Sequence, residues 1–242
     1  MSIKVILFDL DGTLLPMDQD VFVKTYFGLL AKKLARYGYQ PEELIQAIWA
    51  GVSAMVKNDG SCNNEGAFWN KFAQIYGEKV REDIPLFDEF YKNEFNGAKE
   101  VCGCNPKAAE VIAGLKEKGF RMVLATNPLF PQIATWNRIQ WAGLTPEDFE
   151  FYTTYETSNY CKPNLKYYEE ILERLAVKPE ECLMVGNDVT EDMIVTKLGM
   201  KVFLLTDCLI NKENKDISVY PNGGFGELMD YINDLGEEER RC

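Results

Sequence analysis

The sequence predicts an α/β fold: a three-layer core around a parallel sheet, plus an inserted all-α domain. The main observation is a series of short apolar runs, each followed by polar residues and then by a helical pattern. Runs that are apolar on both faces are typical of buried parallel strands, because helices cover both sides of such a sheet. We expect strands at 5–8, 120–126, 149–155, 182–187 and 201–206.

Helix signals fall between these strands. Asn105 precedes a proline and the periodic run AAEVIAGLKEK, so it is expected to cap a helix that ends at Gly119. A second helix is expected over 165–176, and Thr190 is expected to cap a shorter one that ends near position 199. This alternation of strands and helices supports the layered core.

Residues 16–100 differ from the rest of the chain, because they carry helical patterns and no convincing strand. A segment of about 85 residues is far too long for a loop between a strand and the next helix. It is therefore expected to form an inserted helical domain, while 1–15 and 101–242 form the core. Its helices are expected at 21–38, 41–57, 65–77 and 84–95.

Composition and charge limit the partners. With 242 residues, of which 46% are hydrophobic, the chain can bury a sizeable core. The net charge of −12 argues against a nucleic-acid partner, because phosphate backbones are bound by basic faces. No run approaches the ~18 apolar residues of a membrane helix, and the N-terminus lacks signal-peptide features. We expect a cytoplasmic monomer or small homo-oligomer with no membrane or nucleic-acid partner.

The residue types present also restrict the chemistry. The absence of histidine excludes Ser-His-Asp and Cys-His catalysis, histidine metal ligands and a histidine general base. The seven cysteines are expected to be reduced, because no secretion signal is present. Cys102 and Cys104 form an isolated Cys-x-Cys motif, which is not expected to bind metal. General acid–base catalysis near neutral pH must then use carboxylates, Lys, Cys or Tyr.

Polar and charged residues follow four of the expected strands. In an open parallel sheet, ligands bind beyond the carboxyl ends of the strands. These ends supply carboxylates, a hydroxyl, an amide and a single ammonium, which we expect to converge on one site. The residues are Asp9, Asp11, Gly12 and Thr13 after the first strand, Thr126 and Asn127 after the second, Lys162 beyond the third, and Asn187, Asp188 and Asp192 after the fourth.

The acids of this set suit phosphoryl chemistry. Asp9 and Asp188 could hold Mg²⁺, which takes oxygen ligands and usually binds through one or two carboxylates plus a substrate phosphate. A free oxygen of Asp9 could then attack phosphorus and form an aspartyl-phosphate. Asp11 could protonate the departing alkoxide and afterwards deprotonate the water that hydrolyses the intermediate.

The remaining residues suit phosphate binding. Thr126, Asn127 and Lys162 could bind the transferring oxygens, and Gly12 lets the backbone approach closely. Thr13 is assigned to the same set of phosphate-binding residues. Taken singly, these residues and the acids also fit a turn, a helix N-cap, a solvated loop lysine or the start of a helix. Their joint occurrence at four strand ends favours a reaction centre.

These residues resemble the four signature motifs of the haloacid dehalogenase-like hydrolase superfamily. The motifs are DLDGT at 9–13, Thr126 after a strand, Lys162 before a proline, and GNDVTED at 186–192. The resemblance covers the whole chain, in the form of motifs at the strand ends. It implies a Rossmann-like core with a helical cap of type one inserted after the first motif.

The resemblance also implies roles for the acids. Asp9 would be the nucleophile, and Asp11 the general acid/base. Asp9, Asp188 and Asp11, the last through its backbone carbonyl, would bind Mg²⁺. The fourth motif reads Gly-Asn-Asp instead of the commoner Gly-Asp-x. Because a carboxylate binds Mg²⁺ better than an amide, we assign Asp188 as a metal ligand. Asn187 and Asp192 are assigned to the residues that surround the metal ligands.

The presence of Asp11 favours phosphate-ester hydrolysis, because the dehalogenases and the phosphonate-cleaving members of the superfamily lack this second aspartate. We expect a Mg²⁺-dependent phosphatase that acts on a small phosphorylated metabolite, such as phosphoglycolate, a sugar phosphate or a nucleoside monophosphate. A phosphotransferase or mutase acting on a sugar phosphate is the main alternative. A non-catalytic phospho-accepting signalling domain is another, although it would need no helical lid.

The cap is expected to select the substrate by closing over the site and contacting the leaving group. Asp18 and Gln19, just after the first motif, could contact the substrate. Aromatic residues of the cap could line the substrate pocket or, at helical spacing, form the core of the cap itself. They are Tyr26, Trp49, Phe68, Trp69 and Phe72.

Overall fold

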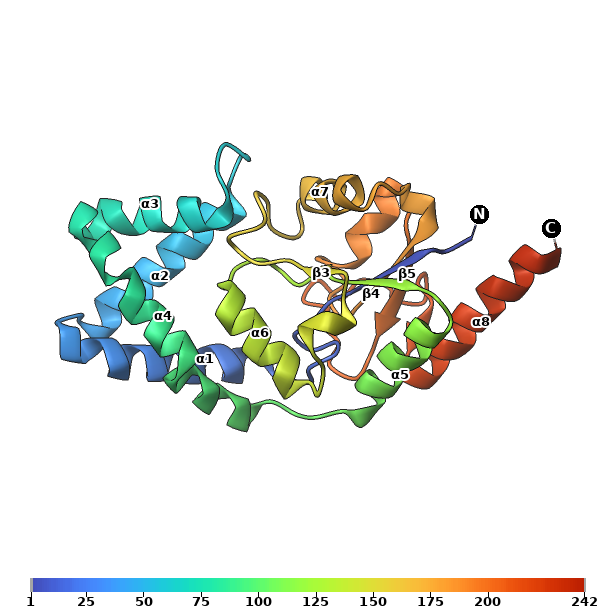
Figure 1. Ribbon diagram of the computed structural model, residues 1–242, viewed down its shortest axis with the longest axis horizontal. Coiled ribbons are helices and arrows are strands. Elements are labelled where there is room, and N and C mark those ends of the chain that lie inside the picture. Colours follow the sequence, from blue (N-terminus) through green and yellow to red (C-terminus); the bar gives the residue numbers. More distant parts are fainter. Residues whose placement is uncertain (1, 242) are drawn as a thin grey trace.

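The computed structural model describes the backbone of residues 2–241 and the side chains of residues 2–236. Within these residues, a six-stranded parallel sheet has the strand order β3-β2-β1-β4-β5-β6 (Figure 1). This confirms the predicted α/β fold and places β1, which precedes the first motif, inside the sheet. The strands are β1 Val5–Phe8, β2 Arg121–Leu124, β3 Phe151–Tyr152, β4 Cys182–Gly186, β5 Lys201–Leu205 and β6 Asn222–Gly223.

Helices cover both faces of the sheet. Every residue of β1 is buried, and its side chains alternate between the two faces. Ile6 and Phe8 join an apolar cluster that includes residues of α5 and α8, whereas Val5 and Leu7 join a second cluster beneath α7. Burial on both faces explains the unbroken apolar run in the sequence. The bounds are α5 Pro106–Glu117, α7 Leu165–Leu175 and α8 Phe225–Arg241.

The ends of α5 follow the expected local signals. Asn105 Oδ1 accepts a hydrogen bond from the backbone N–H of Lys107 at 3.1 Å. Gly119, just beyond the helix, has a φ of +84°, a conformation that glycine adopts without steric cost. The predicted cap at Asn105 is therefore confirmed.

Other elements differ from the prediction. β3 is shorter than the expected 149–155. The helix α6, Gln132–Trp141, was not predicted, and because it begins only at Gln132, residues 126–128 do not cap a helix. The short helix expected after Thr190 is a 3₁₀ helix at Met193–Leu198. Thr190 does not cap it; instead its backbone N–H donates to the carboxylate of Asp188 at 2.7 Å.

The inserted segment 16–100 is helical, as expected, and its helices lie together at the end of the molecule away from the C-terminus (Figure 1). The chain enters and leaves it side by side: the Gly103 N–H donates to the Pro16 carbonyl at 2.7 Å, and Met17 bridges to Cys102. The exact domain bounds stay a prediction. The elements are α1 Gln19–Leu34, α2 Pro41–Val56, α3 Asn64–Tyr76 and α4 Ile84–Lys92, with 3₁₀ helices at Ala35–Tyr37, Glu78–Asp83 and Glu94–Val101.

The inserted helices pack directly on the core. The ring centroid of Phe22 in α1 lies 6.2 Å from that of Phe95 and 6.3 Å from that of Phe130, which precedes α6. Phe95 also packs on Trp141 of α6 at 5.2 Å. These rings belong to, or pack against, the same apolar cluster as one face of the sheet. The apolar core is therefore continuous from the inserted helices to the sheet.

Two further observations concern the whole chain. Six of the seven cysteines are free thiols, and the seventh, Cys242, lies outside the described residues. Among the residues that the structure describes, no helix combines the length and apolar character needed to cross a membrane.

Candidate active site

Lys162 lies between two acids at the carboxyl ends of the strands. It is 1% exposed, and its Nζ donates to Asp9 Oδ1 at 2.8 Å and to Asp192 Oδ1 at 2.6 Å. Burial alone would lower the pKa of Lys162, but Asp192 and Asp9 together hold this pKa well above its usual value. The amine is therefore an ammonium ion that joins the first, third and fourth motifs.

Asp9 is the first residue beyond β1, and both of its carboxylate oxygens are held. Its backbone N–H donates to the Val185 carbonyl at 2.9 Å, which extends the pairing of β1 with β4. Oδ1 accepts from Lys162, and Oδ2 lies 3.1 Å from the Thr13 hydroxyl. A nucleophile that must meet phosphorus in line requires a fixed orientation of this kind.

Asn187 packs beneath the turn of the first motif. Gly12 has a φ of +82°, and a Cβ there would lie 2.2 Å from Asn187 Nδ2, so this position requires glycine. Asn187 Nδ2 donates to the Cys208 carbonyl at 2.7 Å, and Oδ1 lies 3.1 Å from the Thr13 hydroxyl. Because both ends of the amide are used within the protein, Asn187 supports the turn, and Asp188 is the better candidate for a metal.

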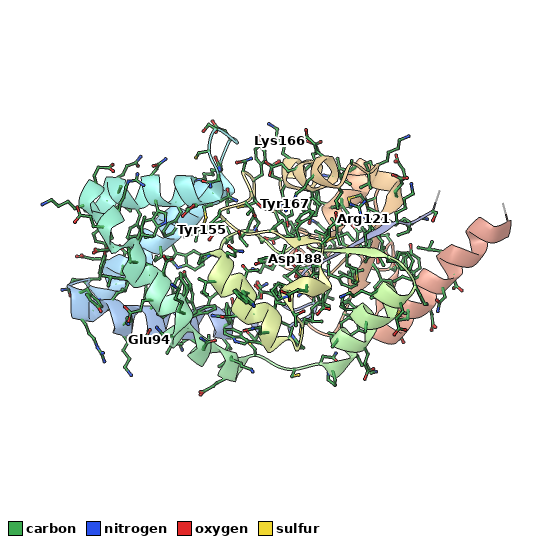
Figure 2. The ribbon with its side chains drawn as sticks, viewed as in Figure 1. Glu94, Arg121, Tyr155, Lys166, Tyr167 and Asp188 are labelled. Atoms are coloured by element: carbon green, nitrogen blue, oxygen red, sulfur yellow. The ribbon has the colours of Figure 1, made fainter. Side chains whose placement is uncertain are left out.

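Asp188 and Asp192 shape the turn after β4. Asp188 lies near the middle of the molecule (Figure 2), and its Oδ1 accepts two backbone N–H groups of this turn at 2.7 and 2.9 Å. The Asp188 N–H donates to Asp192 Oδ2 at 3.0 Å. A Cβ at Gly186 would lie 2.1 Å from the same oxygen. Burial raises the pKa of the Asp192 carboxyl, against the charge of Lys162.

Asp11 has a different environment from Asp9. Its carboxylate forms an ion pair with Arg138 of α6, a fully buried guanidinium that lies 4.3 Å from the ring centroid of Phe130. Burial raises the pKa of Asp11, against the charge of Arg138. Its Oδ1 is buried and has no hydrogen-bond partner among the described residues. An acid with a raised pKa suits a proton donor, whereas the held carboxylate of Asp9 suits a nucleophile.

The second motif lies against the fourth. Thr126 is buried, and its carbonyl accepts hydrogen bonds from the Thr153 hydroxyl at 2.7 Å and from the Tyr167 hydroxyl at 2.9 Å. Asn127 Nδ2 donates to Glu191 Oε2 at 3.0 Å. Asn127 Oδ1 is buried without a partner within the described part of the chain. A buried acceptor without a partner is a group that a bound ligand or water can complete.

The sequence matches the family of haloacid dehalogenase-like hydrolases over residues 3–197. The chain belongs to this family. Two curated relatives are named glyceraldehyde 3-phosphate phosphatase. The one from Methanothermobacter thermautotrophicus is 30% identical over 54% of this chain and 57% of its own length. The one from Methanocaldococcus jannaschii is 25% identical over 98% of this chain and 100% of its own length.

A solved structure shares the fold of this haloacid dehalogenase-like hydrolase. The HAD phosphatase from Thermococcus onnurineus aligns with a TM-score of 0.59 at 18% identity, over 95% of this chain and 98% of that chain. The family resemblance that the motifs predicted is therefore confirmed, and the protein is an enzyme of the hydrolase class.

The side chains and carbonyl expected to bind a metal offer oxygen donors, which are of the kind that magnesium takes. No group of three or more His, Cys, Asp or Glu side chains in the described residues is arranged to hold a metal. The expected metal ligands differ from such a group, because they are two side-chain carboxylates, those of Asp9 and Asp188, and the backbone carbonyl of Asp11. Mg²⁺ prefers such oxygen donors and keeps several waters. The buried Asp11 Oδ1, which has no partner among the described residues, offers an acceptor for one of them.

Three polar residues around the site were not predicted from the sequence: the buried Arg138 and Asn64, and the half-buried Glu191. Asn64, at the start of α3, is fully buried, and its Nδ2 donates to the Tyr160 carbonyl at 3.2 Å. It thereby ties the inserted helices to the chain just before Lys162. Glu191 lies inside the fourth motif, but Arg138 and Asn64 have no signal in the sequence, because each occupies an ordinary position in a helix.

Asp18 and Gln19 take no part in the hydrogen bonds of the strand ends that are described above. Asp18 Oδ1 accepts from the backbone N–H groups of Asp20 and Val21, both at 3.0 Å, and so caps α1. Asp18 and Gln19 line a polar cleft together with residues of the segment 207–212. Their contact with a substrate stays a prediction.

Most of the named aromatic residues of the inserted segment are part of its core. Tyr26, Phe68, Trp69 and Phe72 are buried in the apolar cluster, as the packing interpretation expects, whereas Trp49 is half exposed. All of them except Phe72 also line a cavity of about 110 Å³ between the inserted helices and the segment 129–131.

Proposed function

We propose that this enzyme is a Mg²⁺-dependent phosphatase that hydrolyses a small phosphorylated metabolite through an aspartyl-phosphate. The observation that carries the proposal is the carboxylate of Asp9, held between the buried Lys162 ammonium and the Thr13 hydroxyl at the end of β1. The names of the two relatives, both glyceraldehyde 3-phosphate phosphatases, support the same class of reaction.

In the first step, an oxygen of Asp9 attacks phosphorus, and the bond between phosphorus and the leaving oxygen breaks. Asp11 donates its proton to that oxygen, so the alcohol leaves in its neutral form. Burial raises the pKa of Asp11 above its ordinary value, against the charge of Arg138. The ammonium of Lys162 stabilises the negative charge on the phosphoryl oxygens.

In the second step, water attacks the phosphorus of the aspartyl-phosphate, and Asp11 takes one of its protons. The bond between phosphorus and the Asp9 oxygen breaks, which restores the carboxylate and releases inorganic phosphate. Thr126 and Asn127 are proposed to hold the phosphoryl oxygens in both steps. The inserted helices limit access of bulk water to the intermediate.

The proposed metal ligands are the carboxylates of Asp9 and Asp188 and the backbone carbonyl of Asp11. When bound there, Mg²⁺ neutralises charge on the phosphate and offsets the repulsion between the acids. Gly12 keeps the backbone close to this site, and Thr13 orients the nucleophile.

Release of phosphate from p-nitrophenyl phosphate tests the proposal. We expect turnover with Mg²⁺, none after chelation, and a loss on the order of 10⁴-fold or more in kcat for Asp9→Asn, because the nucleophile is removed. Asp234→Asn, an exposed acid on α8, is the control and should keep full activity. Full activity of Asp9→Asn would contradict the covalent route.

The products separate this proposal from the alternatives. Transfer of the phosphoryl group to a sugar hydroxyl instead of water would identify a phosphotransferase or mutase. A long-lived phospho-Asp9 without turnover would identify a signalling domain. Free phosphate, released in a one-to-one ratio with the alcohol, supports hydrolysis.

A further inference from the structure

The cavity beside the second motif is apolar throughout. It encloses about 110 Å³, and among the side chains that the structure describes, its lining is aliphatic, aromatic or proline and includes no charged residue. Each of α1 to α4 contributes to it. Tyr155, which Figure 2 shows between the inserted helices and the core, lines it from the core side. The half-exposed ring of Trp49 is part of the same wall.

The tyrosines of this cavity supply no charge. The hydroxyls of Tyr26 and Tyr91 are hydrogen-bonded to each other at 2.8 Å. Burial raises the pKa of Tyr26 to about 12, and it raises the pKa of Tyr91 and of Tyr155 in the same direction. All three phenols are therefore neutral near physiological pH. The lining offers no ionic partner to a second charged group of a ligand.

Phe130 joins the cavity to the reaction centre. Its ring lines the cavity and also packs on the guanidinium of Arg138, 4.3 Å from the ring centroid. Arg138 in turn forms the ion pair with Asp11. A leaving oxygen must lie beside Asp11 to receive its proton. The cavity therefore lies on the far side of Phe130 and Arg138 from Asp11, within the reach of a leaving group that extends beyond that oxygen.

We propose that the leaving group of the substrate carries a compact apolar or aromatic group, and that this group occupies the cavity. The inference rests on the proposed phosphatase function and names its substrate class. An engineered apolar cavity of roughly 150 Å³ binds benzene, so about 110 Å³ suits a group of about four to six carbons. A small polar leaving group such as glyceraldehyde would lose hydrogen bonds to water there and gain few in return.

A series of primary alkyl phosphates tests the inference: ethyl, butyl, 3-methylbutyl and 2-phenylethyl phosphate. Their leaving alcohols have similar acidity, so differences in kcat/KM report binding of the alkyl group. We expect kcat/KM to rise roughly fourfold for each methylene until the cavity is filled. The 3-methylbutyl and 2-phenylethyl esters should also exceed glyceraldehyde 3-phosphate.

Two positions on α2 give a matched pair of variants. Val52 lines the cavity, whereas Val56, one turn later, is 43% exposed and lies outside it. Val52→Trp should fill the cavity and bring the kcat/KM ratio of the 3-methylbutyl to the ethyl ester close to one. Val56→Trp should leave this ratio unchanged. Trp49→Ala, at a half-exposed position that tolerates substitution, removes part of the wall and should also lower the ratio.

The outcomes separate the cavity from the chemistry. If phosphate release continues, two results overturn the inference. One is an equal kcat/KM for all esters in the unmodified enzyme. The other is a kcat/KM ratio of the 3-methylbutyl to the ethyl ester that is unchanged in both cavity variants. If no ester is hydrolysed, including p-nitrophenyl phosphate, the proposed function fails instead. In that case, calorimetric titration with 2-phenylethyl phosphonate and ethyl phosphonate tests the inference about the cavity by itself. Tighter binding of the phenylethyl compound, lost in Val52→Trp, supports the inference. Equal binding of the two compounds overturns it.

Discussion

The strand-end site and the neighbouring cavity meet at Phe130, yet they are built in opposite ways. At the strand ends, Lys162 bridges two buried acids. In the cavity, no charged residue lines the wall, and the hydroxyls of Tyr26 and Tyr91 satisfy each other. We infer that paired charges fix the reaction on one side, whereas shape and apolar surface select the leaving group on the other. Buried charge should therefore dominate stability only at the strand ends.

The largest effect is expected at Lys162. Replacing it in Lys162→Met leaves the carboxylates of Asp9 and Asp192 buried without their cation, which costs about 3 to 5 kcal/mol. Urea unfolding should show the loss as a lower midpoint, together with loss of phosphate release. Lys166→Met is the matched control, because Lys166 (Figure 2) is exposed and its Nζ lies 5.2 Å from the centroid of the Tyr160 ring.

The control is expected to lose less than about 1 kcal/mol, which is the usual value of an exposed cation–π contact. Equal losses in the two lysine variants would show that burial of the ion pairs does not set the effect. The comparison is direct, because both substitutions remove one lysine charge and add the same side chain.

A smaller effect is expected at Gly186, where the strand meets the acidic turn. In Gly186→Ala, the new Cβ would lie 2.1 Å from Asp192 Oδ2, so Asp192 must move away from Lys162. We expect a loss of about 1 to 3 kcal/mol, as for other overpacked positions, and a lower kcat. Thermal unfolding and phosphate release measure both effects.

Gly114→Ala provides the contrast. Gly114 lies within α5, and nothing lies within 4 Å of the position that its Cβ would take. Alanine there should stabilise the protein by about 0.5 to 1 kcal/mol, because glycine weakens a helix. If Gly186→Ala stabilised the protein as Gly114→Ala is expected to do, the contact between the new Cβ and Asp192 would not be destabilising.

The strand-end site could be predicted from the sequence, because parallel strands bring their carboxyl ends to one edge of the sheet. Asp9 and Lys162 follow separate strands, and the structure joins them at 2.8 Å. Arg138 could not be predicted, because its position in α6 resembles an ordinary helix position and its partner, Asp11, lies 127 residues earlier. Four residues of the cavity were named from the sequence as possible pocket residues, but how they come together was not predictable, because the walls of the cavity come from four helices and two core segments.

Local competition explains the remaining misses. Thr190 has the chemistry of a helix cap, but the carboxylate of Asp188 lies two residues earlier and takes the N–H of Thr190 itself. β6, Asn222–Gly223, is only two residues long and has no apolar run, so its pairing with β5 depends on the fold around it. Elements specified by tertiary contacts leave no periodic pattern in the sequence.

The smallest effect is expected for the exposed ion pair of Arg121 and Glu150. Two hydrogen bonds at 2.7 and 2.8 Å join them, but the side chains are 40% and 43% exposed. A double-mutant cycle with Arg121→Ala and Glu150→Ala, followed by urea unfolding, should give a coupling of only about 0.2 to 1 kcal/mol. High salt should reduce it further.

The pH dependence of this coupling completes the comparison. Hydrogen bonds from Arg121 lower the pKa of Glu150, so the folded state favours the carboxylate form. The coupling should be fully present above the ordinary pKa of a glutamate, including neutral pH, and should disappear as the pH falls through the lowered value. A coupling as large as the loss in Lys162→Met would contradict the argument. The distances in the two ion pairs are alike, so burial is the variable that separates them.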